Sequence, residues 1–361
     1  MDFSFTETQN DAAELASTIF KNECTPERLK AADAGRFDSG LWASLGSAGL
    51  LGLSVPEEDG GAGLGVLELC TVLIEAGQLV APVPLVAHLP TAMALAAFGD
   101  ASQKELLAGA ISGESVLTAA VSEERDHMPA SPVTSAVADG EVWLLTGVKS
   151  VVPAAGSAAA FVVTASTPDG VRAFVVLPGA GVTVVEQRVS DGARVGRVEL
   201  DGAVGTLLGG ADTVPWFEQR LSLAASAFEL GVVRGALDLT AAYSKTREQF
   251  GRPIGTFQAV RQRLADAYID VLGADLVLWQ AAWRLDEELE ASMEVASAKL
   301  WAADTGHKVA HTTVHVHGGV GIDMDGEAHR YFTVGKLGEF LLGGTTDQAR
   351  KIGALLAAEP V

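Results

Sequence analysis

The chain has 361 residues, and its 25 Lys and Arg against 46 Asp and Glu give a formal net charge of −21. This acidic balance disfavours nucleic acid and anionic membranes as main partners, because both attract positive charge. The apolar fraction of 48% supports a large core in two or three domains. No apolar run reaches the roughly 18 residues of a membrane span, and the acidic start MDFSFTETQND does not resemble a signal peptide. Two cysteines are too few for a disulfide framework or a CxxC metal site, which favours a cytoplasmic protein.

Residues 1–115 are predicted to be helical, because apolar side chains recur at spacings of three and four. Two helix starts carry capping patterns: Thr6 is followed three positions later by Gln9, and Thr25 precedes a proline and a glutamate. The Pro- and Gly-rich stretch 56–63 interrupts the helices. It is either a plain connector or a loop that faces a ligand.

Residues 116–212 are predicted to form a small antiparallel β-sandwich or barrel. Helical spacing stops there, and turn signals such as Asp139-Gly140 and Pro178-Gly179 appear at intervals of roughly ten residues. The β-branched runs between these turns are 115–121, 142–145, 161–164, 173–177 and 182–185.

Residues 213–361 return to helix, with long periodic stretches at 229–246, 257–285 and 291–311. Glycine-rich segments break this region at 250–255 and 315–321. The order of helices, β module and helices indicates an α+β chain of three domains, 1–115, 116–212 and 213–361. It disfavours a dinucleotide-binding parallel sheet, and the GxGxxG, P-loop, HExxH and GxSxG motifs are absent.

The segment 247–258 is the densest combination of polar residues and glycine in the chain. Arg247 can donate two hydrogen bonds to a phosphate, and Gln258 lies near a predicted helix start, where backbone N–H groups favour an anion. The alternative is a solvated turn between helices.

Histidines gather near the second glycine-rich break. His315 and His317 precede two glycines on a segment predicted to be extended, which would let the backbone approach a ligand closely. His307 and His311 share one helical face, but no cysteine or suitably spaced carboxylate completes a metal site. We therefore predict no metal, and expect donors for a phosphate or a ring.

At these residues the chain resembles the acyl-CoA dehydrogenase family over its whole length. The resemblance is carried by REQFGRPIGTFQAVRQRLAD and HVHGGVG, and in that order by FSFTETQ, VPEEDGGAGLG and LLTGVKSVVPAA. It implies an N-terminal helical domain, a middle β domain and a C-terminal four-helix bundle. It also implies noncovalent FAD, shared between two subunits of a dimer of dimers. The family removes an α-proton from an acyl-CoA thioester and transfers the β-hydride to the flavin.

The resemblance also implies which residues hold FAD. Arg247 would bind the pyrophosphate of the FAD held mainly by the neighbouring subunit. The other residues that would contact this shared cofactor are Phe250, Phe257, Gln258, His315, Val316, His317, Gly318, Gly319, Thr345 and Asp347. On the β module, the residues that would meet the chain's own flavin are Val121, Ser122, Val151, Val152 and Pro153.

The catalytic glutamate of the family is missing at both of its known places. Gly343 occupies the place before Gly-Thr near the C-terminus. The alternative place, at the start of the first long C-terminal helix, falls near Leu221, or on Gln219 and Arg220 if a gap is allowed. None of these is a carboxylate, and a thioester α-proton needs one. The glycine turn after Ser122-Glu123 is lost as well.

Three functions follow as expectations. The first is a base-lacking subunit of an α2β2 acyl-CoA dehydrogenase, acting on an acyl-CoA such as a steroid side-chain CoA ester and completing the FAD site of a base-bearing paralogue. The second is an active homotetramer with Glu218 or Glu339 as a relocated base. The third is a noncatalytic scaffold that binds acyl-CoA or flavin.

Overall fold

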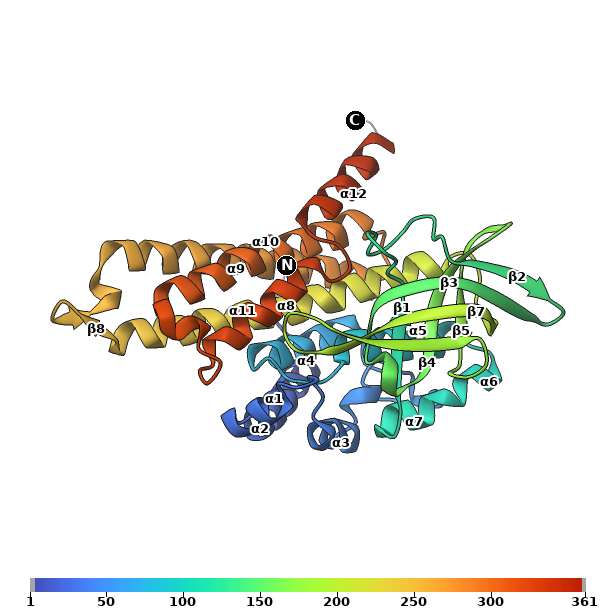
Figure 1. The fold of residues 1–361 in the computed structure, drawn as a ribbon, viewed down its shortest axis with the longest axis horizontal. Coiled ribbons are helices and arrows are strands. Elements are labelled where there is room, and N and C mark those ends of the chain that lie inside the picture. The colour runs from blue at the N-terminus through green and yellow to red at the C-terminus, as the bar shows by residue number, and fades with distance from the viewer. Residues whose placement is uncertain (1–3, 359–361) are drawn as a thin grey trace. The chain divides into compact units, whose positions relative to one another are not determined.

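The computed structural model describes residues 4–358, and its backbone divides into two compact units (Figure 1). The first unit comprises residues 1–33, 70–81 and 225–361, and the second comprises 34–69 and 82–224. Within the described part of the chain, none of the helices combines the length and apolar character needed to cross a membrane.

The first unit is built of helices, two of which, α4 and α8, continue into the second unit. Its helices are α1 (Glu7–Glu23), α2 (Pro26–Ala32), α4 (Val66–Gln78), α8 (Thr213–Thr246), α9 (Gln258–Asp286), α10 (Ser292–His317), α11 (Ala328–Phe340) and α12 (Thr345–Ala358). Short elements between them are β8 (Glu248–Gln249), β9 (Arg252–Pro253), η4 (Ile254–Thr256) and η5 (Gly318–Ile322). Long, tightly packed helices confirm the predicted C-terminal bundle, and Figure 1 shows α9 and α10 side by side.

The predicted helix starts are confirmed. The Thr6 hydroxyl accepts from the Gln9 N–H at 3.3 Å, and the Gln9 side chain accepts from the Thr6 N–H at 2.9 Å, a reciprocal capping box. Thr25 caps α2, with Pro26 as its first residue.

Two predicted helix boundaries are wrong. Helix α8 begins at Thr213 rather than Glu229, because Pro215 lies in the first turn, where no intrahelical N–H is required. Helix α10 continues to His317 instead of ending near His311, and the chain leaves the helix only at Gly318, whose φ is 62°. The segment expected to be extended at 315–317 is therefore helical.

The second unit contains a seven-stranded sheet. Its strands are β1 (Val116–Ala120), β2 (Ser135–Asp139), β3 (Val142–Pro153), β4 (Ala158–Thr167), β5 (Gly170–Val176), β6 (Val182–Arg188) and β7 (Arg194–Leu208). Strand β5 pairs antiparallel with both β4 and β7, β3 pairs with both β2 and β7, and a single pairing of Ser135 with Ser166 joins β2 to β4. The five strands β2, β3, β7, β5 and β4 thus close into a barrel.

The antiparallel prediction holds for most strands but not all. Strand β1 pairs parallel with β4 at the side of the barrel, and β6 pairs with β7 outside the ring. Strands β2 and β7 were not expected. The barrel interior is apolar, with Phe161, Phe174 and Val198 fully buried.

Short helices complete the second unit. They are α3 (Ser39–Ser47), η1 (Leu50–Gly52), η2 (Glu57–Asp59), α5 (Leu85–Phe98), α6 (Ala101–Lys104), α7 (Leu106–Ser112) and η3 (Ala155–Ser157). Within the stretch 56–63, a Cβ added at Gly61 would overlap the carbonyl of Val55, so glycine is needed for this close backbone approach.

A fully buried histidine joins α5 to the sheet. His88 Nδ1 accepts the N–H of Leu117 on β1 at 3.1 Å, and its ring packs edge-on against Trp42 at 4.8 Å between centroids. Burial lowers the pKa of His88 to about 4. The folded protein therefore holds a neutral imidazole.

We predict that His88 makes stability depend on pH in the acid range. Its pKa is lower in the folded chain than the ordinary 6.5 of the unfolded chain, so the unfolded state binds more protons between these values. Stability is complete above pH 6.5 and falls as pH drops towards 4, by on the order of 3 kcal/mol. Urea unfolding of wild type and His88→Asn at several pH values measures this. If the free energy of unfolding changed with pH by the same amount in both proteins, the prediction would be contradicted.

Candidate functional site

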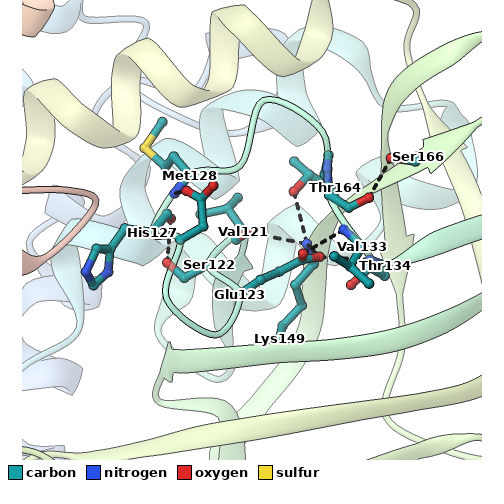
Figure 2. Close-up of polar contacts among 12 residues, drawn as sticks. Val121, Ser122, Glu123, His127, Met128, Val133, Thr134, Lys149, Thr164 and Ser166 are labelled. Carbon is teal, nitrogen blue, oxygen red and sulfur yellow. Dashed lines mark hydrogen bonds and ion pairs between the residues drawn. The ribbon is translucent and has the colours of Figure 1, made fainter. Parts of the chain in front are cut away.

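Two of the residues expected near the chain's own flavin, Val121 and Ser122, directly follow β1 (Figure 2). Val121 and Ser122 are buried, and the Ser122 carbonyl accepts the N–H of Ser150 at 2.9 Å. The Ser122 hydroxyl donates to the His127 carbonyl at 2.7 Å. This hydroxyl is therefore already engaged by the chain itself.

The turn after Ser122 keeps its shape without glycine. Glu123 and Asp126 exchange backbone hydrogen bonds of 2.8 and 3.2 Å, and Arg125 between them has a φ of 66°. That left-handed conformation normally favours glycine. The sequence change noted above thus adds backbone strain here and leaves the turn in place.

The segment 151–153 contains a second strained position. The pairing of β3 with β7 shifts register between Lys149 and Val152, and Val151 within this bulge has a φ of 52°. A β-branched residue rarely adopts this conformation. Val152 is buried, and the Pro153 carbonyl accepts from the Thr118 hydroxyl at 2.6 Å. The segment packs tightly against its own barrel.

A buried ion pair, not anticipated from the sequence, fixes the loop between these elements. Lys149 Nζ lies 2.8 Å from Glu123 Oε1, with side-chain exposures of 0% and 8%, and it also donates to the Val121 carbonyl at 3.3 Å. The same carboxylate accepts the N–H groups of Val133 at 2.7 Å and Thr134 at 2.9 Å. Figure 2 shows the lysine amine at the centre of these contacts. One carboxylate thus holds both ends of the loop 123–134.

The electrostatics of this pair are set by burial and by its own hydrogen bonds. Burial favours the neutral form of Glu123, but the bonds from Lys149, Thr134 and Val133 outweigh it and lower the pKa of Glu123 to about 2. Burial lowers the pKa of Lys149, against the attraction of Glu123 and Glu218. The sequence signal was available: Lys149 is a single charge within the apolar strand β3, and charged residues are rarely buried unless paired.

In the first unit, the turn after α8 presents aromatic and cationic groups outward. Arg247 and Gln258 are exposed, and Phe250 is 92% exposed with a left-handed φ of 55°. The rings of Phe250 and Phe257 meet edge-on at 6.1 Å, and the guanidinium of Arg252 stacks over Phe257 at 4.3 Å. Phe250 and Phe257 are therefore brought together, with Arg252 as an addition, whereas Arg247 and Gln258 lie exposed at the two ends of the same turn.

The end of α10 divides its two histidines between opposite environments. His315 is exposed, whereas His317 is buried, contacts the Thr313 carbonyl through Nδ1 at 2.8 Å and stacks on Tyr243 at 4.2 Å. Burial lowers the pKa of His317. Val316 is buried, and a Cβ added at Gly318 or Gly319 would meet no atom within 4 Å. The open glycine backbone and the single exposed imidazole of His315 would let an organic ligand approach closely, whereas one imidazole alone is a poor metal site. Across residues 4–358 no group of three or more His, Cys, Asp or Glu is placed to hold a metal ion.

The turn between α11 and α12 holds Gly343 in a conformation that suits glycine. Its φ is 98°, and Leu342 before it has a φ of 59°. A Cβ at Gly343 would lie 3.0 Å from Gln348 Nε2. Thr345 begins α12, and Asp347 Oδ2 accepts the Gly344 N–H at 3.0 Å. A side chain at position 343 would therefore be strained by the backbone and by its neighbours.

The carboxylates proposed as relocated bases have other surroundings. Glu339 is paired with Lys336, and its Oε2 lies 3.1 Å from His307 Nδ1. Glu218 is half-buried in the second unit, where its charge favours the protonated form of Lys149.

The other place for a base, at the start of the long helix, holds no acid either. Leu221 is buried, Gln219 is half-buried, and the Arg220 guanidinium stacks 3.7 Å from the ring of Trp216.

Comparisons with known proteins bear on this arrangement. Two family models match: "Acyl-CoA dehydrogenase, N-terminal domain" over residues 6–114 and "Acyl-CoA dehydrogenase, C-terminal domain" over residues 218–355. Acyl-CoA dehydrogenase FadE27 of Mycobacterium tuberculosis is 45% identical, with 100% of both chains covered.

Two solved structures are similar over nearly the whole chain. A chain of the ChsE4-ChsE5 complex from Mycobacterium tuberculosis has a TM-score of 0.95 at 44% identity and full coverage of both chains. A chain of a variant of the Tcur3481-Tcur3483 steroid ACAD has a TM-score of 0.93 at 40% identity, with 98% of each chain covered.

We predict that Lys149→Met costs about 3–5 kcal/mol of stability, because Glu123 is then left buried without its counter-charge. The double variant Glu123→Gln/Lys149→Met should regain most of this loss. Arg194→Met, which breaks an exposed ion pair with Glu186 in the same sheet, should change stability by less than about 1 kcal/mol. Urea unfolding measures all three. A Lys149→Met variant as stable as Arg194→Met would show that the pair does not hold the loop.

Proposed function

Because the chain belongs to the acyl-CoA dehydrogenase family, we propose that it is the base-lacking subunit of a heterotetrameric, FAD-dependent acyl-CoA dehydrogenase. In this role it supplies side chains to an FAD held mainly by a paralogue that carries the catalytic glutamate. The observation that carries the proposal is the turn at Gly343, where backbone and neighbours disfavour any side chain.

The outward-facing residues of the first unit fit the pyrophosphate and adenosine half of FAD. Arg247 offers a bidentate donor for phosphate, and the exposed ring of Phe250 offers an apolar surface for a planar base. The open backbone at Gly318 and Gly319 leaves room for a ligand to approach. When bound, FAD would accept a hydride. These residues would hold the cofactor in place.

The barrel side fits a flavin less well. The Ser122 hydroxyl is engaged by the His127 carbonyl, the Val121 carbonyl accepts from Lys149, and Val151 has a strained left-handed backbone. This imbalance supports a subunit that completes the cofactor site of its partner and binds little FAD alone.

The comparisons support the partner and the substrate class of this proposal. The ChsE4-ChsE5 structure is a complex of two different proteins, and the Tcur3481-Tcur3483 protein is described as a steroid ACAD. We therefore propose a paralogous partner in an α2β2 assembly and a steroid side-chain CoA ester as substrate. Cys24 and Cys70 are buried and form no disulfide, which agrees with a cytoplasmic location.

Neither alternative function is favoured by the site. An active homotetramer would need Glu339 or Glu218 as its base, but the Glu339 carboxylate is already engaged by Lys336 and lies 3.1 Å from His307 Nδ1. A noncatalytic scaffold that binds flavin would use the same exposed Arg247, so the reaction itself has to separate the two functions. Bleaching of flavin absorbance by an acyl-CoA, in the complex with the paralogue, separates an enzyme from a scaffold.

We predict that the chain alone has no acyl-CoA dehydrogenase activity and that co-purification with a base-bearing paralogue restores it. Arg247→Gln should weaken FAD binding to the complex by about 10- to 100-fold, through loss of a charge-assisted bidentate contact. Arg194→Gln serves as the control and should bind FAD like wild type. Dye-linked dehydrogenation and equilibrium dialysis of FAD provide the two readouts. Full activity of the isolated chain would overturn the proposal.

We predict that Gly343→Glu does not make the isolated chain active. The substitution should lower the free energy of unfolding by about 1–3 kcal/mol, because the left-handed backbone strains any side chain. Gly343→Ala should cost a similar amount, which separates backbone strain from charge. The matched control is Gly353→Glu within α12, where an added Cβ meets nothing within 4 Å. It should be neutral or slightly stabilising. Thermal unfolding and the acyl-CoA assay test this. An active Gly343→Glu chain of undiminished stability would refute it.

A further inference from the structure

A carboxyl group is buried inside the helical bundle of the first unit without hydrogen bonds. Glu229 on α8 is 1% exposed, and neither of its carboxyl oxygens has a hydrogen-bond partner within residues 4–358. A Cβ added at Gly306 on α10 or at Gly338 on α11 would overlap these oxygens, and one at Gly335 would touch them at 3.4 Å. Glycines on two helices thus make the space that the carboxyl group occupies.

A buried cation that attracts Glu229 is Lys299 on α10, which is 1% exposed. Its Nζ donates to the carbonyl of Gly338 at 3.1 Å and to that of Glu339 at 3.4 Å. These carbonyls belong to the last turn of α11, where intrahelical donors run out. Lys299 therefore caps α11 from inside the bundle. Glu229 is buried against Gly338, the glycine whose carbonyl Lys299 binds, and attraction between the two groups favours their charged forms.

Lys299 holds the end of α11, and side chains of α12 hold the turn that follows it. Gln348 Nε2 donates to the Leu342 carbonyl at 3.2 Å, and Asp347 accepts the N–H of Gly344 at 3.0 Å. Between Lys299 on one side and Gln348 on the other lie the left-handed residues Leu342 and Gly343. The position of Thr345 and Asp347 therefore depends on where α11 ends.

We propose that Glu229 and Lys299 form a buried positioning pair that sets the end of α11, and through it the placement of Thr345 and Asp347 against the shared FAD. The inference rests on the proposed function, since it concerns the same cofactor contact. Neither residue touches FAD; both act through the turn 341–344.

Burial and charged groups on the neighbouring helices together set the pKa values of Glu229 and Lys299. Burial raises the pKa of Glu229 well above its usual range, against the attraction of Lys299; Glu339 adds to the rise and Lys336 opposes it. Burial lowers the pKa of Lys299 to about 8, against the attraction of Glu229, Glu339 and Asp347. Below pH 8 the charged amine donates strongly to the two carbonyls. As pH rises through 8 the amine loses its proton, and the cap on α11 weakens.

The test uses the complex with the paralogue and measures the FAD dissociation constant from about pH 7 to about pH 9. Wild type should bind FAD more weakly as the pH rises. Lys299→Met should bind about tenfold more weakly at all these values and lose the pH dependence, because the charge-assisted cap is gone. Glu229→Gln should keep FAD binding at the lower pH but shift the pH midpoint down, because Lys299 loses its counter-charge.

The double variant Glu229→Gln/Lys299→Met separates positioning from stability. Without a lone buried charge it should unfold near the wild-type temperature, yet it should remain about tenfold weaker for FAD. The control is Lys308→Met on the same helix, whose amine is exposed and paired with Asp304 and Asp270; it should behave as wild type.

Two failures are distinguishable. A double variant with wild-type FAD affinity and pH profile overturns the positioning pair and leaves the proposed function standing. A wild-type complex that takes up no FAD overturns the proposed function, and the positioning pair with it.

Discussion

The left-handed backbone at Leu342 and Gly343 is the constraint on which the proposed absence of a catalytic base in this chain rests. At a φ of 98° an L-residue is strained, and a Cβ at position 343 would also press on Gln348. The turn is anchored to α11 on one side and to α12 on the other. A glutamate at position 343 would therefore meet both an unfavourable backbone conformation and close neighbours, because the surrounding contacts are built around glycine.

The residues predicted to contact FAD differ in character between the two units. In the first unit, the groups that suit a phosphate and an aromatic base lie outward and exposed around Arg247 and Phe250. In the second unit, the polar groups at Ser122 and Glu123 bond to their own loop. Buried charged groups lie in both units: Glu123 pairs with Lys149 in the barrel, and in the bundle Lys299 bonds to the Gly338 carbonyl while Glu229 is buried against the same glycine. A chain with these two characters is suited to serve a cofactor that a partner holds.

Local signals allowed part of the fold to be predicted. The capping box of Thr6 and Gln9 involves only neighbouring residues, so the sequence alone indicates it. Strand β7 was missed because three glycines and several charges interrupt its apolar pattern, and only pairing with β3, β5 and β6 makes it a strand. Helix α10 runs past the expected break because His317 stacks on Tyr243, a tertiary contact.

The candidate site shows the same division between local and tertiary information. Family motifs led to Arg247, Phe250 and Phe257, which the fold brings together on one turn. Glu123 lies 26 residues from Lys149, and Gly338 lies 39 residues from Lys299, so no local pattern pairs them. The most direct test of the central claim is the flavin content of the purified assembly with its paralogue. If the chain contacts the cofactor of its partner but binds none of its own, the assembly should contain about one FAD for every two chains. One FAD for every chain would contradict the claim.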